Sequence, residues 1–429
     1  MSQGCSPRTR LPISQPQLFN RIESILLSEP SQLLIPRGFR FGATKAGLKA
    51  SGRPDLSLIV ADSPASAAAV FTANRVQAAP LAIDKEHLRA TGGRVRVAVI
   101  NAGNANCAAG EPGVDAARAT CAAAAQVFAC RPEEVFPSST GIIGVPLPAE
   151  KIVAALPALA AQIGPDPGHF HQVAQAILTT DTVEKIASTC LDIGGREVRI
   201  AALCKGAGMI HPQLVPHATM LVYILTDAAI DPAPLNAYLL AAIETSFNRI
   251  SVDGDTSTND TVLLLASGAS GATVEPGNAQ FAAALSQVCT SLAKQIVADG
   301  EGITHVVELR IDGAATDADA LRIARAIAHS PLIKTAWAGS DPNWGRLAAA
   351  IGYSGAAVDP GRIDIWFGSQ RICRDGGRAA EFDEAAAHAY LKQREFSISI
   401  QLNQGAGACI FWTTDLTAEY VHINADYST

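Results

Sequence analysis

The sequence of 429 residues lacks an apolar run that approaches the roughly 20 residues a membrane-spanning helix needs. It also lacks a long run of basic residues: 33 lysines and arginines stand against 40 aspartates and glutamates, a formal net charge of −7. A basic patch is the electrostatic footprint of a nucleic-acid-binding protein. We therefore expect a soluble protein that binds neither membranes nor nucleic acid, whereas small polar substrates remain possible.

Cysteine pairs with the spacing of metal ligands are missing as well. The nine cysteines are an odd number, spread from Cys5 to Cys409 without a CxxC pair. This usage is typical of buried thiols in a reducing compartment, and not of a disulfide framework or a zinc site. We expect a cytoplasmic protein.

A calcium site is excluded at the one loop that suggests it. The segment SFNRISVDGDTSTND, residues 246–260, contains Asp253, Asp255 and Asp260, but it lacks the bidentate glutamate at the twelfth position of a calcium loop. We expect no metal, and we interpret the segment as a hydrogen-bonding network beside an active site.

Acidic residues are absent from the first part of the chain until Glu23, while Arg8, Arg10 and Arg21 fall within it. This composition would suit a weak organelle-targeting segment, but residues 1–36 contain no convincing cationic amphipathic helix. A disordered extension is the favoured interpretation.

The most informative stretch is KGAGMIHPQLVPHATMLVYILTD, Lys205 to Asp227. Its first half is rich in glycine and proline, and residues 220–225 form an apolar run typical of a buried strand. Ala218 and Thr219 lie at the junction, where a self-cleaving chain could expose a new amino terminus. A free α-amine has a pKa of roughly 7.7 to 8.0, so it could accept the proton of the Thr219 hydroxyl. The alternative is structural, since threonine is common in strands.

This stretch resembles the autocleavage signature of the ornithine acetyltransferase family, also called the bifunctional glutamate N-acetyltransferases. The resemblance is carried by KGAGMI, HP and ATML, and it extends over roughly residues 38–429 through VFTANRVQAAP, VFPSSTGIIG, LTTDTVEK, the 246–260 segment, GEG, GSDPNWGR and the terminal YVHINADYST. One departure is the loop between Pro212 and Ala218, which is longer than is usual in the family.

Each of these motifs also has a structural interpretation. The turn at Thr140 and Gly141 could present donors to an oxyanion or could be only a turn. Thr179 could cap a helix, Lys205 could be solvated, and Glu301 could lie in a surface turn. The asparagines of NAGNAN, residues 101–106, favour a tight turn, and structure is also favoured for GSDPNWGR. A chain terminus is usually frayed.

The family resemblance assigns roles to these positions. It implies that Thr219 is the nucleophile after cleavage between Ala218 and Thr219, and that Thr140 and Gly141 form the oxyanion hole. The implied substrate contacts are Thr179, Lys205, Thr219, Glu301, Asn424 and Thr429, with Lys205 on a carboxylate and Glu301 on the ammonium of ornithine.

The fold class we expect is α/β (α+β): a layered αββα-type sandwich with a smaller C-terminal α/β domain, cleaved into two chains that stay together in an α2β2 assembly. The expected divisions are an extension at 1–36, the alpha chain at 37–218, the start of the beta chain at 219–303 and a domain at 304–429. We expect strands at 56–61, 95–100, 135–140, 198–203, 220–225 and 261–266, with the last two paired, and a further strand at 304–311 in which Val307, Leu309 and Ile311 face one way. Helices are expected at 112–130, which is alanine-rich and should pack on both sides, at 148–163, which Pro157 should kink or split, and at 231–247, 278–299 and 317–329.

The implied reaction is ping-pong transfer of an acetyl group from N-acetylornithine to glutamate, in arginine biosynthesis, with no cofactor because the protein supplies nucleophile, base and donors. Three alternatives remain open. The enzyme could also use acetyl-CoA or act on a related acyl amino acid, the fold could host an aminopeptidase or amidase with water as acceptor, or the longer loop could leave an uncleaved, non-catalytic scaffold or regulatory relative.

Overall fold

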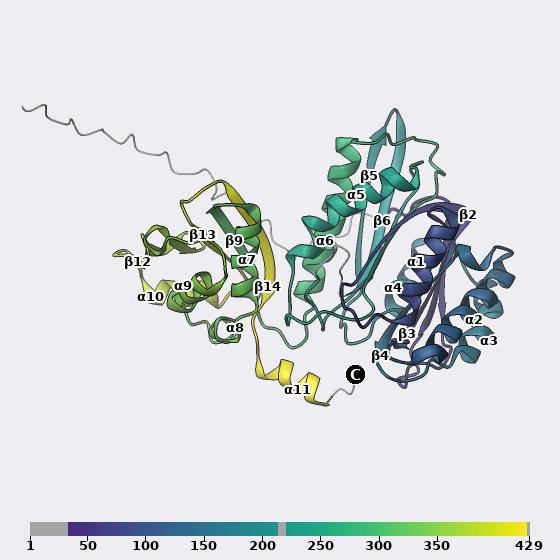
Figure 1. Ribbon diagram of the computed structural model, residues 1–429, viewed down its shortest axis with the longest axis horizontal. Helices are drawn as coiled ribbons and strands as arrows, with labels where there is room; N and C mark the ends of the chain where they lie inside the picture. Colours follow the sequence, from purple (N-terminus) through teal and green to yellow (C-terminus); the bar gives the residue numbers. More distant parts are fainter. Residues whose placement is uncertain (1–32, 213–219, 427–429) are drawn as a thin grey trace, which may run out of the picture.

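The computed structural model describes residues 33–212 and 220–426, which form two units, each built on its own sheet (Figure 1). Ala218, Thr219 and Thr429 lie outside the described residues, as do the first 32 residues. Residues 33–36 belong to the expected extension, yet Ile35 is buried and its carbonyl accepts a hydrogen bond from Arg199.

The first unit contains eight strands in the order β4-β3-β2-β8-β7-β6-β5, with β1 beside β2. Their bounds are β1 Phe39–Thr44, β2 Leu56–Phe71, β3 Arg94–Asn104, β4 Val135–Ile142, β5 Lys185–Ile193, β6 Arg196–Lys205, β7 Leu221–Thr226 and β8 Thr261–Ala266. The predicted pairing of the two strands around the signature is confirmed, because β7 and β8 run parallel over their full length. All six residues of each are buried, as their apolar composition predicts.

The long strand β2 joins two halves of this sheet. Residues 56–61 pair with β1 and β3, whereas residues 66–71 pair with β8, and the exposed residues 62–64 separate the two parts. Phe136 of β4 and Tyr223 of β7 belong to one buried core, although β7 lies four strand spacings from β4 in the order, about 19 Å in a flat sheet. The two halves therefore face each other across a shared core, which contains Phe41 and Phe136 from one half and Leu263 from the other.

Helices cover the outer faces of both halves. Their bounds are α1 Ala79–Thr91, α2 Gly110–Phe128, α3 Ala149–Ala160, α4 Pro167–Ala176, α5 Pro232–Glu244 and α6 Ala279–Ala298, with short 3-10 turns at Pro132–Glu134 and Phe247–Arg249. Helices α2 and α3 pack on β2 and β3, and α5 and α6 pack on β6 to β8. The expected αββα layering is thus present. Among the described residues, α6 alone is long and apolar enough to cross a membrane, and it buries one face in this core.

One local prediction about these helices is wrong. The alanine-rich α2 is not packed on both sides, since its outer face is exposed; alanine has so little apolar surface that exposure costs little. Of the two effects predicted for Pro157, a kink or a split, the split does not occur, because α3 continues through this residue. The carbonyl that loses its partner there belongs to Val153, which is 37% exposed and so lies on the solvent side.

The second unit is a six-stranded sheet in the order β12-β11-β10-β13-β9-β14. Its strands are β9 Val306–Ala314, β10 Asp364–Phe367, β11 Gln370–Arg374, β12 Gly377–Arg378, β13 Glu395–Gln401 and β14 Gly407–Thr414, and its helices are α7 Asp317–Ala328, α8 Pro331–Ala338, α9 Trp344–Tyr353, α10 Glu384–Leu391 and α11 Ala418–Asp426, with a 3-10 turn at Pro360–Arg362. As predicted from their alternation, Val307, Leu309 and Ile311 share one core with α7.

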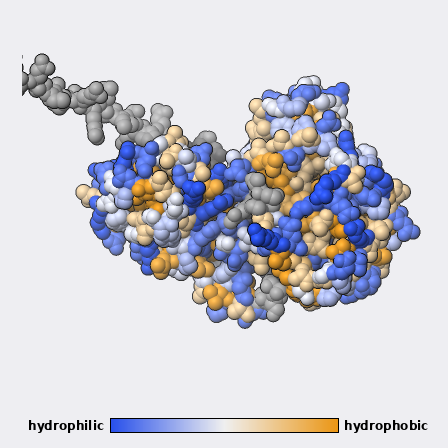
Figure 2. All heavy atoms as spheres, in the orientation of Figure 1, coloured by the Kyte–Doolittle hydropathy of each residue, from blue (hydrophilic) through white to orange (hydrophobic). Residues whose placement is uncertain are grey.

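The two units are joined by direct contacts and by α11. The backbone N–H of Ser251 donates to the carbonyl of Trp412 over 3.0 Å, and α6 packs against β14. Figure 2 shows hydrophilic residues spread over both units on the viewed face, with smaller apolar areas between them. The eight cysteines in the described part of the chain are free thiols, and six of them are buried.

Candidate functional site

One pocket of about 160 Å³ brings together predicted site residues from distant parts of the sequence. Six of the nine line it, namely Thr140, Gly141, Thr179, Lys205, Glu301 and Asn424. They come from the ends of β4 and β6, the loop before β5, the turn after α6, and α11. The remaining three, Ala218, Thr219 and Thr429, lie outside the described residues.

The turn at the end of β4 can hold only glycine at position 141. Gly141 has φ of 130°, and an added Cβ would lie 2.3 Å from the carbonyl carbon of Gly103. The register between β3 and β4 shifts at this point, which marks a bulge. Thr140 precedes the turn, and its Oγ1 lies 3.5 Å from the Nζ of Lys205.

Asparagine side chains fix this turn from behind. Ser139, next to Thr140, donates its hydroxyl proton to Asn101 Oδ1 over 2.6 Å, and its carbonyl accepts a hydrogen bond of 2.8 Å from Asn259 Nδ2. Asn101 also donates to the Asn104 carbonyl, which closes the NAGNAN turn as its composition predicts. These hydrogen bonds of Asn101 and Asn259 fix the backbone of Ser139, and so the position of Thr140 in the pocket wall.

A buried set of alternating charges supports Lys205. Asp181 accepts hydrogen bonds from the backbone N–H groups of Thr179 and Gly206, the neighbour of Lys205. Lys185 Nζ lies 2.7 Å from Asp181 Oδ1 and 2.6 Å from Asp299 Oδ2. Burial alone would raise the pKa of Asp181, but the charges of Lys205 and Lys185 hold it at about 2.

This charged set was not predicted from the sequence. Lys185 and Asp299 are separated by more than a hundred residues, and only the TTD motif pointed towards Asp181. The sequence did contain a local signal for this ion pair, because the oppositely charged Asp181 and Lys185 are only four residues apart. The motif turns the chain instead of capping a helix, because α4 ends before it at Ala176, β5 follows it, and Asp181 accepts the N–H of Thr179 within the loop.

Glu301 reaches the pocket through space that glycine leaves free. A Cβ at Gly208 would lie 2.2 Å from the Glu301 carboxyl carbon, so only glycine permits this approach. Glu301 is 8% exposed, and its Oε2 accepts a hydrogen bond of 2.9 Å from Asn424 Nδ2. Gly302 likewise allows α11 to approach closely, because an added Cβ would lie 2.4 Å from the backbone nitrogen of Tyr420.

The 246–260 segment binds the loop that precedes the predicted cleavage site. Asp253 Oδ1 accepts the N–H groups of Ile210 and Asp255 over 2.8 and 3.0 Å, and the Thr256 hydroxyl donates to the carbonyl of His211 over 3.1 Å. Burial raises the pKa of Asp253 to about 6. A role in positioning Thr219 itself stays a prediction.

A pair of histidines, also missed from the sequence, lies behind this loop. His211 Nδ1 and His329 Nε2 are 3.1 Å apart, and His329 also contacts the hydroxyl of Ser251. Burial lowers the pKa of His211 to about 3 and that of His329 to about 4, so both are neutral at neutral pH. Within residues 33–212 and 220–426, no group of three histidine, cysteine or acidic side chains could hold a metal ion.

The GSDPNWGR motif lies in the second unit and does not line the pocket. Asn343 Oδ1 caps α9 by accepting the N–H of Arg346, and the Arg346 guanidinium donates to the carbonyl of Leu332. These contacts support the structural interpretation of this motif.

Comparison with known proteins agrees with this arrangement. The model of the ArgJ family matches residues 40–429. A protein of Geobacter sulfurreducens named arginine biosynthesis bifunctional protein ArgJ is 46% identical over 397 residues, 92% of this chain and 99% of the relative. A protein of the same name from Symbiobacterium thermophilum is 45% identical over 400 residues, 92% and 98% of the two chains.

Two solved structures are also similar. The crystal structure of an ArgJ protein from Bacillus halodurans is 45% identical and covers 48% of this chain and 98% of its own, with a TM-score of 0.46. An ornithine acetyltransferase from Mycobacterium tuberculosis, complexed with ornithine, is 32% identical. The match covers 42% of this chain and 93% of that structure's chain, with a TM-score of 0.37. By the match along nearly its whole length, the chain belongs to the ArgJ family.

Proposed function

We propose that this member of a family of arginine-biosynthesis enzymes transfers the acetyl group of N2-acetyl-L-ornithine to L-glutamate. The observation that carries the proposal is the pocket itself, where a cation, a buried carboxylate and a hydroxyl beside a glycine-only turn converge. The ornithine bound to the relative from Mycobacterium tuberculosis supports a ligand of this class.

The proposed nucleophile is created by self-cleavage between Ala218 and Thr219. The Thr219 hydroxyl would attack the carbonyl carbon of Ala218, the peptide C–N bond would break to leave an ester and a free α-amine, and water would hydrolyse the ester. Two chains result. They would stay associated because β7, after the cut, pairs with β6, before it, with Leu221 opposite Lys205, and because β8 pairs with β2.

The proposed reaction then proceeds in two half-reactions. Thr219 Oγ attacks the acetyl carbonyl while its own α-amine accepts the hydroxyl proton, and ornithine leaves as the C–N bond breaks and its nitrogen takes up that proton. The α-amine of glutamate next attacks the acetyl ester, which forms N-acetylglutamate and restores the hydroxyl. Thr140 and Gly141 would stabilise the oxyanion in both steps.

Charged groups would orient the substrate in this scheme. The Lys205 ammonium lies beside Thr140, so a substrate carboxylate bound to it would place the neighbouring acetyl group near the oxyanion donors. Glu301, oriented by Asn424, would bind the ammonium of the ornithine side chain. Thr179 and Thr429 complete the proposed substrate contacts, and an α2β2 assembly of the cleaved chains is part of the same proposal.

Acetyl-CoA is the second proposed acetyl donor, for formation of N-acetylglutamate. It is favoured by the word bifunctional in the names of the relatives from Geobacter sulfurreducens and Symbiobacterium thermophilum. Incubation of the purified protein with acetyl-CoA and glutamate, without acetylornithine, tests this directly.

The main activity is tested by incubating the purified protein with N2-acetylornithine and glutamate. We expect ornithine and N-acetylglutamate in equal amounts. Acetate in place of N-acetylglutamate would indicate the hydrolase alternative, and no reaction together with an intact chain would indicate the non-catalytic one.

A further inference from the structure

The pocket carries more negative charge than its predicted contacts account for. Asp255 lines it together with Glu301, and Asp253 lies directly behind. Repulsion from the charges of Asp255 and Glu301 adds to the effect of burial on the pKa of Asp253. The three carboxylates therefore lie within electrostatic reach of one another.

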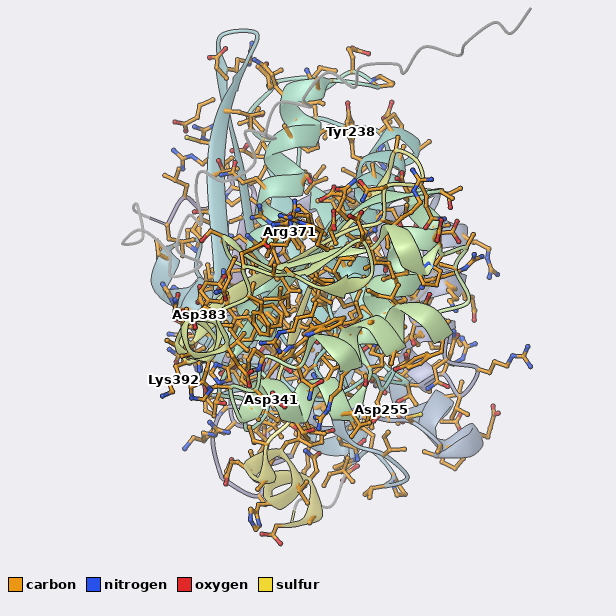
Figure 3. All side chains as sticks on the ribbon, turned by 90° about the vertical axis from the view of Figure 1, so that its left-hand side faces the viewer. Tyr238, Asp255, Asp341, Arg371, Asp383 and Lys392 are labelled. Carbon is orange, nitrogen blue, oxygen red and sulfur yellow. The ribbon has the colours of Figure 1, made fainter. Side chains whose placement is uncertain are left out.

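The two carboxylates that line the pocket differ in what holds them. Glu301 is nine-tenths buried and hydrogen-bonded to Asn424. Asp255 lines the pocket and is exposed (labelled in the lower part of Figure 3), and in the part of the chain that the structure describes its carboxylate makes no hydrogen bond or ion pair. A carboxylate without a partner at a binding pocket is available to a cation of the ligand.

Tyr420 provides a second indication of this charge. Burial raises the pKa of its hydroxyl, and the charges of Asp253, Glu301 and Asp255 raise it further. Tyr420 also lines the pocket, so the acidic groups act on a common region within it. Lys205 is the cation that lines the same pocket, and a zwitterionic ligand matches this pairing of charges.

We propose that Asp255 is a specificity residue which, with Glu301, binds the ammonium group at the end of the acetyl donor's side chain. The inference rests on the proposed function. The donor and the acceptor carry opposite charges on their side chains, an ammonium in acetylornithine and a carboxylate in glutamate. Asp255 therefore attracts the donor and repels the acceptor.

The effect of one charge at this exposed position is modest. Two unit charges about 4 Å apart in a water-like medium interact by ~1 kcal/mol, which corresponds to about a fivefold change in affinity. The sign of the change is what distinguishes the proposal. A structural role for Asp255 would impair both substrates alike, whereas the electrostatic role impairs one and favours the other.

The test uses the mature enzyme and the variant Asp255→Asn, which removes the charge and keeps the shape. We expect the KM for N2-acetylornithine to rise about fivefold, the KM for glutamate to fall, and kcat to change little. The conservative variant Asp255→Glu keeps the charge, so its KM for N2-acetylornithine should stay closer to the wild-type value than that of Asp255→Asn. The control Asp341→Asn changes an exposed aspartate that does not line the pocket, and should leave both values unchanged.

Calorimetry separates this inference from the reaction itself. It compares the binding of ornithine with that of norvaline, an amino acid that keeps the α-ammonium but lacks the side-chain ammonium. Asp255→Asn should weaken ornithine about fivefold and leave norvaline unchanged. Equal effects on both ligands, or KM values that rise together, would overturn the role of Asp255. Failure of the wild-type protein to form N-acetylglutamate would contradict the proposed function instead, and the binding experiment would still decide the inference.

Discussion

The substitution Gly208→Ala tests whether Glu301 acts from the position the structure gives it. The added Cβ would lie 2.2 Å from the carboxyl carbon and Oε1, and 2.3 Å from Oε2, whereas ordinary contact begins near 3.4 Å. The carboxylate must therefore move by about 1.2 Å, the difference between 3.4 and 2.2 Å. It would lose the hydrogen bond of 2.9 Å from Asn424 and its approach to the substrate's ammonium.

The expected cost falls on activity and not on stability. Glu301 is the flexible end of a side chain, and Gly208 has no positive φ, so alanine introduces no backbone strain. A hydrogen bond to a charged group contributes about 1.5–3 kcal/mol. We expect kcat/KM for N2-acetylornithine to fall roughly 10- to 100-fold, with an unchanged melting temperature.

A matched control lies two residues earlier. At Gly206 an added Cβ meets the terminal Cδ1 of Ile210 at 3.0 Å and other atoms at 3.5 Å, so Gly206→Ala should keep most of the activity. Both variants are assayed as mature enzymes with acetylornithine as the varied substrate. Wild-type kinetics in Gly208→Ala would refute the role of Glu301, and equal losses in both variants would show that the loop tolerates no change at all.

Two further predictions concern the oxyanion turn and the response to acid. Thr140→Ala should reduce turnover by roughly 10² to 10³, the usual cost of one oxyanion donor, while the circular dichroism spectrum stays native; unchanged turnover would remove Thr140 from the mechanism. Acid should destabilise the protein through His211 and His329, whose pKa values of about 3 and about 4 lie below the ordinary 6.5. Because the unfolded chain binds protons first, the contribution of these histidines to stability is complete above about pH 6.5 and is lost as the pH falls from there to about 3. Denaturant titrations across this range measure the loss, and it should shrink in His329→Gln.

The sequence predicted those parts of the fold that depend on local pattern. The buried strands β7 and β8, helix α6 and the alternating face of β9 follow from runs and periods that are visible within a few residues. The family motifs also led to six residues that the structure gathers at one pocket.

Features that depend on distant partners were not predicted. The division of β2 is one example, because residues 56–60 pair with β3 and residues 66–71 with β8, and the partners of a strand cannot be read from its own residues. The same holds for Lys185 between Asp181 and Asp299, and for the pair His211 and His329. The sequence did not decide whether Pro157 kinks or splits its helix, and α3 continues because a proline on the exposed side of a helix leaves the unpaired carbonyl to water.

Mass spectrometry of the purified protein, followed by N-terminal sequencing, tests the central claim most directly. We expect two polypeptides, the second beginning at Thr219, and a single full-length polypeptide without activity for the variant Thr219→Ala. A wild-type protein that remains one intact chain, or full activity in Thr219→Ala, would contradict the proposed mechanism.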